Sequence, residues 1–86
     1  MNPLRVKLKF FSLARDAAGL HETVVELAEG SKLRDLMKLE IVKKVLDFLK
    51  SLGVEPAILV NGEKVGDEHP LRDGDEVAIL PPSSGG

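Results

Sequence analysis

Apolar and polar residues alternate at the start of the sequence, from Leu4 to Phe11. A period of two predicts a half-buried strand, with Leu4, Val6, Leu8 and Phe10 on one face and Arg5, Lys7, Lys9 and Phe11 on the other. A second strand is predicted from Glu22 to Ala28, where Thr23, Val25 and Leu27 share a face. We expect the two strands to pair as a hairpin across a short irregular segment that contains Ala17-Ala18-Gly19.

The spacing of apolar residues becomes helical after Gly30-Ser31, where Gly30 ends the strand and Ser31 is a typical helix N-cap. Lys50 in the last turn and Gly53 just beyond it are typical of a helix C-terminus. The predicted stripe faces a sheet and contains Leu33, Leu36, Met37, Ile41, Val45, Phe48, Leu49 and Leu52. Leu39 and Val42 lie off this stripe, which leaves open a bend or a division into two helices.

The rest of the chain predicts a hairpin and a final strand. The apolar run from Pro56 to Val60 is followed by Asn61-Gly62, a strong hairpin signal because both residues tolerate positive φ. Residues 66–75 are polar and turn-rich, and residues 77–80 form a last apolar strand before Pro81-Pro82. The order of elements predicts an α+β fold, with a mixed sheet and a helix packed on one face.

Size and composition narrow the classes of function. A chain of 86 residues makes one small domain, which we place at residues 1–80 and follow with a functional tail at residues 81–86. The absence of cysteine excludes disulfides and thiol catalysis. A net charge of −2 with Phe as the sole aromatic type argues against a nucleic-acid partner. Neither a secretory signal nor an apolar run near the roughly 18 residues of a membrane span is evident, so we expect no membrane partner and a cytoplasmic location.

The tail Pro81-Pro82-Ser83-Ser84-Gly85-Gly86 cannot extend the core, because its prolines lack ladder donors and its other residues have little to bury. Fully extended, these residues would reach about 20 Å. Glycine has no Cβ, so the end of the tail could enter a narrow tunnel in a partner. The alternative is that the tail is incidental, since about 0.5% of chains would end in two glycines by chance.

A resemblance to a known family lies at both ends of the chain. The segment from His69 to Ala78, with Pro81-Pro82 and Gly85-Gly86 after it, resembles the small, sulfur-carrier subunit of molybdopterin synthase. Phe10-Phe11, followed by Arg15 and Gly19, is similar to the N-terminal motif of that family. The chain departs from the family at Ser83, where Val is common, and at Lys64, where relatives can offer an apolar contact. The resemblance implies a ubiquitin-like β-grasp fold.

The family's chemistry implies that the chain is not catalytic alone. An E1-like enzyme would use ATP and Mg²⁺ to adenylate the Gly86 carboxylate, and a sulfur donor protein would supply the sulfur of a thiocarboxylate. With Gly85, Pro81 and Pro82 as the rest of the tail, Gly86 would then donate sulfur to cyclic pyranopterin monophosphate in the large subunit. No permanently bound cofactor or metal is implied.

Three residues are predicted to bind partners. Phe11 and Leu80 would lie opposite the inward-facing Phe10 and Ile79, so both are expected near the tail in an apolar docking patch. Arg15 is included because of its place in the N-terminal motif. The alternative for Phe11 and Leu80 is a second small apolar cluster, and for Arg15 it is a simple surface cation.

The sequence also offers other candidate sites and functions. His69 with its acidic neighbours matches no Ca²⁺ loop and is better explained by turn chemistry, and no motif pairs His21 with Ser12, Ser31 or Ser51 as a nucleophile. The other functions are a protein modifier joined to lysines through Gly86, a sulfur carrier for tRNA thiolation or thiamine synthesis, or a binding module with an incidental tail. The Pro-Pro context favours molybdenum or tungsten cofactor synthesis.

Overall fold

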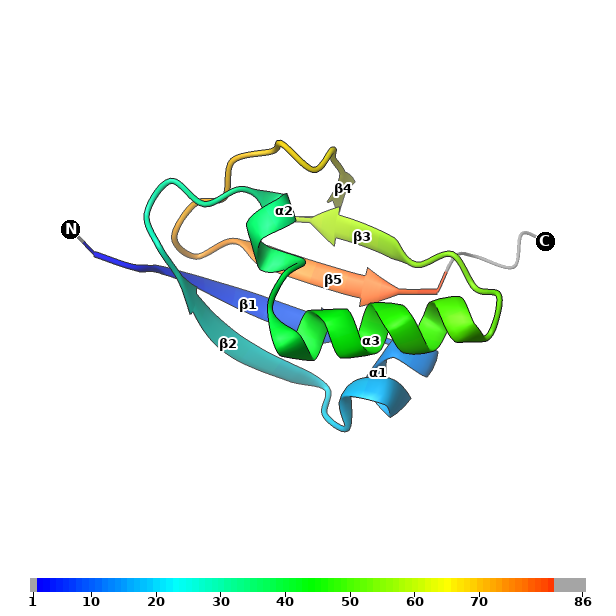
Figure 1. Ribbon diagram of the computed structural model, residues 1–86. Helices are drawn as coiled ribbons and strands as arrows, with labels where there is room; N and C mark the ends of the chain where they lie inside the picture. Colours follow the sequence, from blue (N-terminus) through cyan, green and yellow to red (C-terminus); the bar gives the residue numbers. More distant parts are fainter. Residues whose placement is uncertain (1, 82–86) are drawn as a thin grey trace.

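A computed structural model describes residues 2–81. Its five strands form one mixed sheet in the order β2-β1-β5-β3-β4 (Figure 1). The strands are β1 (Leu4–Phe10), β2 (Glu22–Leu27), β3 (Ala57–Val60), β4 (Glu63–Lys64) and β5 (Glu76–Leu80), and the helices are α1 (Leu13–Ala18), α2 (Leu33–Leu36) and α3 (Glu40–Ser51). The central strands β1 and β5 run parallel, and each of the other neighbouring pairs is antiparallel.

The core lies between the sheet and α3, which crosses one face of it (Figure 1). The sheet contributes fully buried residues such as Leu8, Val77 and Ile79, and α3 contributes Val42 and Leu49. Burial of these side chains is the main source of stability in a domain without disulfides. The predicted α+β class and ubiquitin-like β-grasp fold are confirmed.

The predicted pairing of the first two strands is confirmed, but their connection is not irregular. Strand β1 buries all four of its predicted inward residues and pairs antiparallel with β2, so that Leu4 lies opposite Leu27. The connection contains α1 instead, because Ala14 and Ala18 are four residues apart and both bury against the core. Gly19 ends α1 in the left-handed conformation, with φ 80°.

The predicted helical region is divided into α2 and α3, and the interruption at residues 37–39 changes which face is buried. Val42, predicted off the stripe, is fully buried in α3. Phe48 and Leu52, predicted on it, are 40% and 52% exposed. The single-stripe prediction was wrong at these positions because the break resets the helical phase of the residues that follow it.

Both ends of the helical region have defined caps. Ser31 was predicted to be the N-cap, but Lys32 occupies that position and the Ser31 hydroxyl donates to the Ala28 carbonyl at 2.6 Å. The backbone N–H of Lys32 instead donates to the Asp35 carboxylate at 2.8 Å, which satisfies a donor at the start of α2. At the end of α3, Gly53 has φ 75° and its N–H donates to the Lys50 carbonyl at 2.9 Å, as predicted for a C-terminal glycine.

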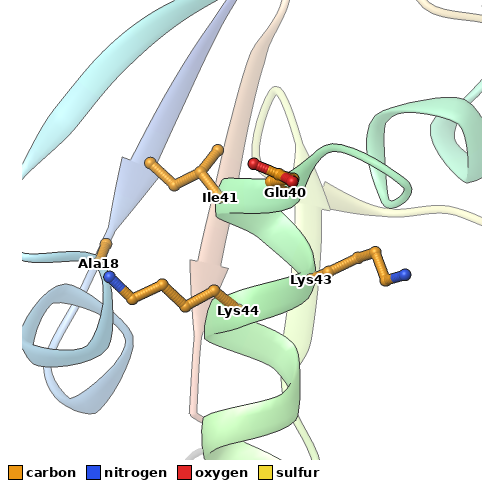
Figure 2. Close-up of a pocket in the computed structure, with 5 residues that line it drawn as sticks. All are labelled: Ala18, Glu40, Ile41, Lys43 and Lys44. Atoms are coloured by element: carbon orange, nitrogen blue, oxygen red, sulfur yellow. The ribbon is translucent and has the colours of Figure 1, made fainter.

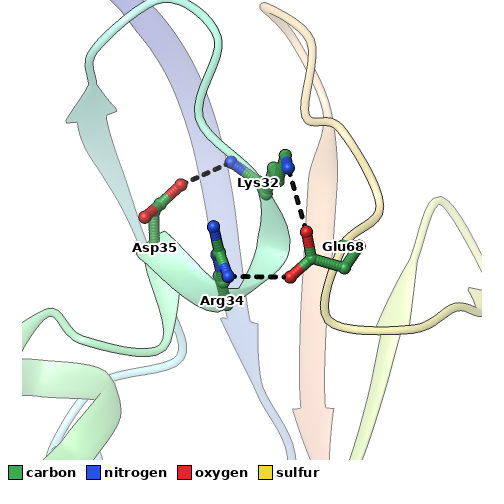
Figure 3. Close-up of polar contacts among 4 residues, drawn as sticks. All are labelled: Lys32, Arg34, Asp35 and Glu68. Carbon is green, nitrogen blue, oxygen red and sulfur yellow. Dashed lines mark hydrogen bonds and ion pairs between the residues drawn. The ribbon is translucent and has the colours of Figure 1, made fainter.

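The polar loop before β5 is held against α2. The Glu68 carboxylate bridges Lys32 Nζ at 2.9 Å and Arg34 Nη1 at 3.0 Å (Figure 3). The hydrogen bond from Lys32 lowers the pKa of Glu68 below its ordinary value. The Leu33 N–H also donates to the His69 carbonyl at 2.9 Å. This loop is therefore fixed to α2 by backbone and side-chain contacts.

The predicted Asn-Gly hairpin joins β3 to β4. Asn61 and Gly62 have φ 51° and 83°, which are the positive values of a type I′ turn. The Asn61 side chain donates to Asp75 at 2.9 Å and accepts from the Glu76 N–H at 3.0 Å, so the turn is tied to β5. Within residues 2–81, no helix has the length and apolar character needed to cross a membrane.

Candidate functional site at the end of the central strands

The parallel strands β1 and β5 end at the same edge of the sheet, where Phe10 of β1 lies opposite Ile79 of β5. The N–H of Phe11 donates to the Ile79 carbonyl at 3.1 Å, which continues the pairing by one residue. Leu80 is the last residue of β5, and Pro81 is the last residue that the structure describes. The structure therefore places Phe11 next to the point where residues 81–86 begin.

Phe11 and Leu80 differ in exposure. Phe11 is 47% exposed, whereas its neighbour Phe10 is 2% exposed in the core. Leu80 is half-buried and lies opposite Ala57 of β3. Their predicted position on the side away from Phe10 and Ile79 is confirmed, and their docking role remains a prediction.

Three further apolar residues join them on the outer face of the sheet, the face directed away from α3. Ala57 and Leu59 of β3 pair with Leu80 and Ala78 of β5, and all four are half-buried. We call Phe11, Ala57, Leu59, Ala78 and Leu80 the outer apolar patch. The sequence analysis named Phe11 and Leu80 and missed the other three. The unbroken apolar run of residues 57–60 was a signal for Ala57 and Leu59, because apolar and polar residues should alternate in a strand that is covered on only one face.

Toward β2, the outer face carries three ion pairs and Val24, which is 57% exposed and lies opposite Lys7. Ion pairs join Arg5 to Glu26 at 3.6 Å, Lys7 to Glu22 at 3.8 Å and Lys9 to Glu76 at 3.1 Å. Their side chains are largely exposed, so each pair contributes little to stability. The charges of each pair neutralise one another, and the five residues of the outer apolar patch offer a partner a group of neighbouring apolar side chains on this face.

Arg15 lies close to the same end of the sheet. It is exposed on α1 and lines a hollow of about 230 Å³ together with Phe11, Ser12 and His21. Ser12 has φ 54° and ψ −126°, and the Ala14 N–H donates to the Phe11 carbonyl at 3.0 Å across this turn. The turn thus brings Phe11 and Arg15, predicted separately, to one side of the molecule. Arg15 forms no ion pair with another described residue.

The predicted tail residues are only partly described. Pro81 is half-buried after β5, whereas Pro82, Gly85 and Gly86 lie outside the described residues. The division into a domain at residues 1–80 and a tail at residues 81–86 therefore remains a sequence prediction, as does the reactive role of Gly86.

The alternative sites gain no support from the geometry. In the described part of the chain, no group of three or more His, Asp or Glu side chains is placed to hold a metal ion. The Ser31 and Ser51 hydroxyls donate to backbone carbonyls at 2.6 Å. Ser12 and His21 line one hollow, but no hydrogen bond is found between them.

Comparison with known proteins covers nearly the whole chain. The model of the ThiS family matches residues 8–86. A molybdopterin synthase sulfur carrier subunit from Chlamydomonas reinhardtii is 36% identical over 86 residues, covering 96% of this chain and 100% of the relative. A solved structure of a putative molybdopterin converting factor, subunit 1, from Pyrococcus furiosus is 35% identical, with a TM-score of 0.78 over 93% of this chain and 99% of that chain.

Two other solved structures concern assembly and a different use of the fold. One is a complex of subunits 1 and 2 of the molybdopterin-converting factor from Helicobacter pylori. A chain of that complex is 27% identical to this one, with a TM-score of 0.67 over 96% of this chain and 100% of that chain. Small archaeal modifier protein 1 from Methanosarcina acetivorans is 31% identical, with a TM-score of 0.67 and 100% of both chains covered.

Proposed function

This chain belongs to the ThiS family, and from that premise we propose that it is the sulfur carrier subunit of a molybdopterin synthase. One observation carries the proposal: the similarity to a named sulfur carrier subunit extends over the full length of that relative, at 36% identity. The family match also continues to residue 86, so it includes the Gly85-Gly86 pair.

The chemistry that we propose begins at the Gly86 carboxylate. A carboxylate is a poor acyl donor because it is anionic and has no good leaving group, so it must first be activated. An E1-like partner would adenylate it with ATP and Mg²⁺, releasing pyrophosphate. The terminal sulfur of a persulfide on a donor protein would then form a bond to the carbonyl carbon as AMP leaves, which gives an acyl disulfide. Attack of a second thiol on the donor's sulfur would break the S–S bond, form a new disulfide and release the thiocarboxylate that carries sulfur to the synthase.

The body of the domain would dock through the outer apolar patch. This patch lies beside residue 81, where the tail begins, and combines an aromatic ring that is 47% exposed with four half-buried aliphatic residues. Aromatic anchors within an apolar centre are common sources of binding energy at interfaces. Its partner would be the large subunit, as subunit 2 is for the chain in the Helicobacter pylori complex. Arg15 would add a cation at the rim.

The chain itself would supply no catalytic acid or base. Its contribution is to bring a narrow, reactive end into a partner's active site, where the partner's groups perform the proton transfers and stabilise the developing charge. Ordering a six-residue tail costs about 6 to 12 kcal/mol at roughly 1 to 2 kcal/mol per residue, so docking of the body has to offset this cost.

Reconstitution tests this function. The chain is incubated with the activating enzyme, ATP, Mg²⁺ and a sulfur donor, and is then mixed with the large subunit and cyclic pyranopterin monophosphate. We expect formation of molybdopterin in a single turnover, and no product from the chain that lacks Gly86 although it stays folded. Equal product from that truncated chain would refute the carrier role.

The similarity to an archaeal modifier protein favours a second candidate. In that function the same acyl adenylate would be attacked by a lysine amine of a target protein, and an isopeptide bond would form as AMP leaves. The two functions share activation and differ in the nucleophile, so the covalent products of Gly86 distinguish them.

A further inference from the structure

Within residues 2–81, strand β2 forms one edge of the sheet and has backbone groups that no other strand uses. The Phe10 N–H donates to the His21 carbonyl at 2.9 Å, which makes these two residues a hydrogen-bonded pair. Antiparallel pairs alternate, so the N–H and C=O groups of Thr23 and Val25 also point toward β1. The N–H and C=O groups of Glu22, Val24 and Glu26 therefore point outward, away from β1. This row can pair with an added strand.

A groove lies on the inner side of the sheet, between the end of α1, which leads into β2, and the start of α3. It has a volume of about 580 Å³ and is lined by Ala18 of α1 and by Glu40, Ile41, Lys43 and Lys44 of α3. Figure 2 shows Ile41 and Lys44 pointing from α3 toward the side of β1 and α1, with the Lys44 amine close to Ala18, whereas Lys43 points away. On the same side of the sheet, Thr23 and Val25 of β2 are half-buried and so only partly covered by the helices.

Neither of the two lysines that line this groove has an acidic partner among the described residues. In the part of the chain that the structure describes, Lys44 and Lys43 form no ion pair. The acidic side chains of β2 are already engaged on the outer face, Glu22 with Lys7 and Glu26 with Arg5. An added chain would thus meet unpaired backbone groups, an apolar wall at Ile41 and an unneutralised amine at Lys44, with Glu40 as the one acidic group of the groove.

We propose that β2 and this groove bind an extended segment of a partner protein, in which apolar residues alternate and an acidic run follows. The segment would add a sixth strand to the sheet. Its inward apolar side chains would pack against Ile41 and Val25, and its acidic run would lie at Lys44. Affinity would come from main-chain hydrogen bonds and apolar burial, and preference for acidic sequence from the amine.

This site goes beyond the proposed function and does not rest on it. The outer apolar patch lies on the outer face, on β3, β5 and the residue that follows β1, whereas the groove lies on the inner side between α1 and α3. The two surfaces share no residue, so the two partners would not compete for the same side chains. The carrier could then be held by one protein while it serves another.

The test uses the full chain and a synthetic peptide in which valine alternates with serine before a run of glutamates. Two further peptides serve as controls: one N-methylated at alternate backbone positions, and one with lysines in place of the glutamates. Titration calorimetry gives affinity, and amide chemical shifts map the site. We expect shifts confined to β2 and the first turns of α3, and loss of binding with either control peptide.

Two protein variants keep the test independent of peptide design. Lys44→Glu should weaken binding by about fivefold or more, because it replaces an attraction by a repulsion, whereas Lys64→Glu on the opposite edge strand β4 makes the same change of charge and should have no effect. Val24→Pro should abolish binding while the domain stays folded, because its outward N–H is not used by the sheet.

Several results would overturn the proposal. They are shifts on the outer apolar patch, equal binding of the N-methylated peptide, or an equal loss of affinity in the Lys44 and Lys64 variants. A concentration-dependent dimer of the chain alone, with protected β2 amides, would also overturn it by showing that a second copy occupies this edge.

Discussion

Phe11 combines an exposed side chain with a fixed backbone position. Its N–H is bonded to Ile79, so the ring is attached to the end of the central strands and not to a loose loop. Phe48 offers a contrast on α3, since it is similarly exposed, at 40%, but lies in the helical layer. The two phenylalanines therefore allow the proposed docking surface to be tested with one residue type.

Replacing Phe11 with Asp should weaken binding to the synthase large subunit by about tenfold or more, because a charge would be buried in an apolar contact. Leu80→Asp should act in the same direction. Phe48→Asp makes the matched change outside the patch and should leave the affinity within about twofold. Calorimetric titrations of folded variants measure this, and an equal effect of the Phe11 and Phe48 substitutions would remove the outer apolar patch from the interface.

At Gly85 the question is whether the tail needs slenderness or only flexibility. We predict that Gly85→Val, and to a lesser degree Gly85→Ala, sharply lowers thiocarboxylate formation or sulfur transfer while docking of the body is kept. Alanine reduces the entropy lost on ordering, so a requirement for flexibility alone predicts a neutral or faster reaction, whereas a steric tunnel predicts a slower one. Wild-type single-turnover rates for Gly85→Val would contradict the threaded tail.

At the scale of the elements, Gly53 ends α3 and sets the direction in which the chain leaves the helix. Gly53 and Val54 donate to the carbonyls of Lys50 and Leu49, both at 2.9 Å, which is the pair of bonds of a Schellman motif. The motif requires the left-handed conformation at Gly53, where φ is 75°. It turns the chain from the helical layer toward β3.

Gly53→Ala should lower the free energy of unfolding by about 1 kcal/mol, since a Cβ is unfavourable in the left-handed region even where no atom clashes with it. Gly66→Ala is the control, because Gly66 has no positive φ and an added Cβ there also meets nothing within 4 Å. Urea unfolding compares the two. A similar loss at both glycines would show that the cost is not one of backbone conformation.

The bridge made by Glu68 should give the domain a small dependence on pH. Its pKa is lowered in the folded state, so its stabilising contribution is complete above the ordinary carboxyl value of 4.5 and is lost as the pH falls through the lower folded value. Glu68→Gln should therefore reduce Tm at neutral pH, with the difference disappearing in acid.

Glu29→Gln is the control for that measurement, because Glu29 is exposed and forms no ion pair with a described residue. The effect should be small because Glu68 is itself exposed to solvent. A Glu68→Gln deficit that persists unchanged at low pH would mean that packing, and not charge, holds the loop.

Elements with a strong local sequence pattern were predicted correctly, and elements without one were missed. β1 was predictable because strict alternation fixes which residues enter the core, and the turn at Asn61-Gly62 because few pairs tolerate its φ values. Helix α1 was missed because its six residues are too few to show a period, and Ala14 and Ala18 become core residues through contacts of α1 with α3, β1 and β5. The division into α2 and α3 is one of the two alternatives that Leu39 and Val42 left open, but its position could not be placed from the sequence.

At the scale of the whole molecule, the sheet brings together residues that are distant in sequence. Phe11 and Leu80 are neighbours because β1 and β5 are parallel and central. The local sequence pattern does not reveal this strand pairing, so the two residues were predicted to share a surface from their expected exposure and from the family resemblance. Ala57, Leu59 and Ala78 were missed because their shared face depends on the order of strands. The docking surface is thus a property of topology, whereas the tail chemistry is a property of sequence.

The central claim, that Gly86 carries sulfur, is tested most directly by the intact mass of the chain purified with its native partners. We predict a species heavier by about 16 Da, the difference between sulfur and oxygen, with the added mass in the C-terminal peptide at the activated carboxyl. The chain with Gly86 deleted should lack this species. An unmodified C-terminus under conditions of active cofactor synthesis, or Gly86 found only in linkage to lysines of other proteins, would contradict the sulfur carrier function.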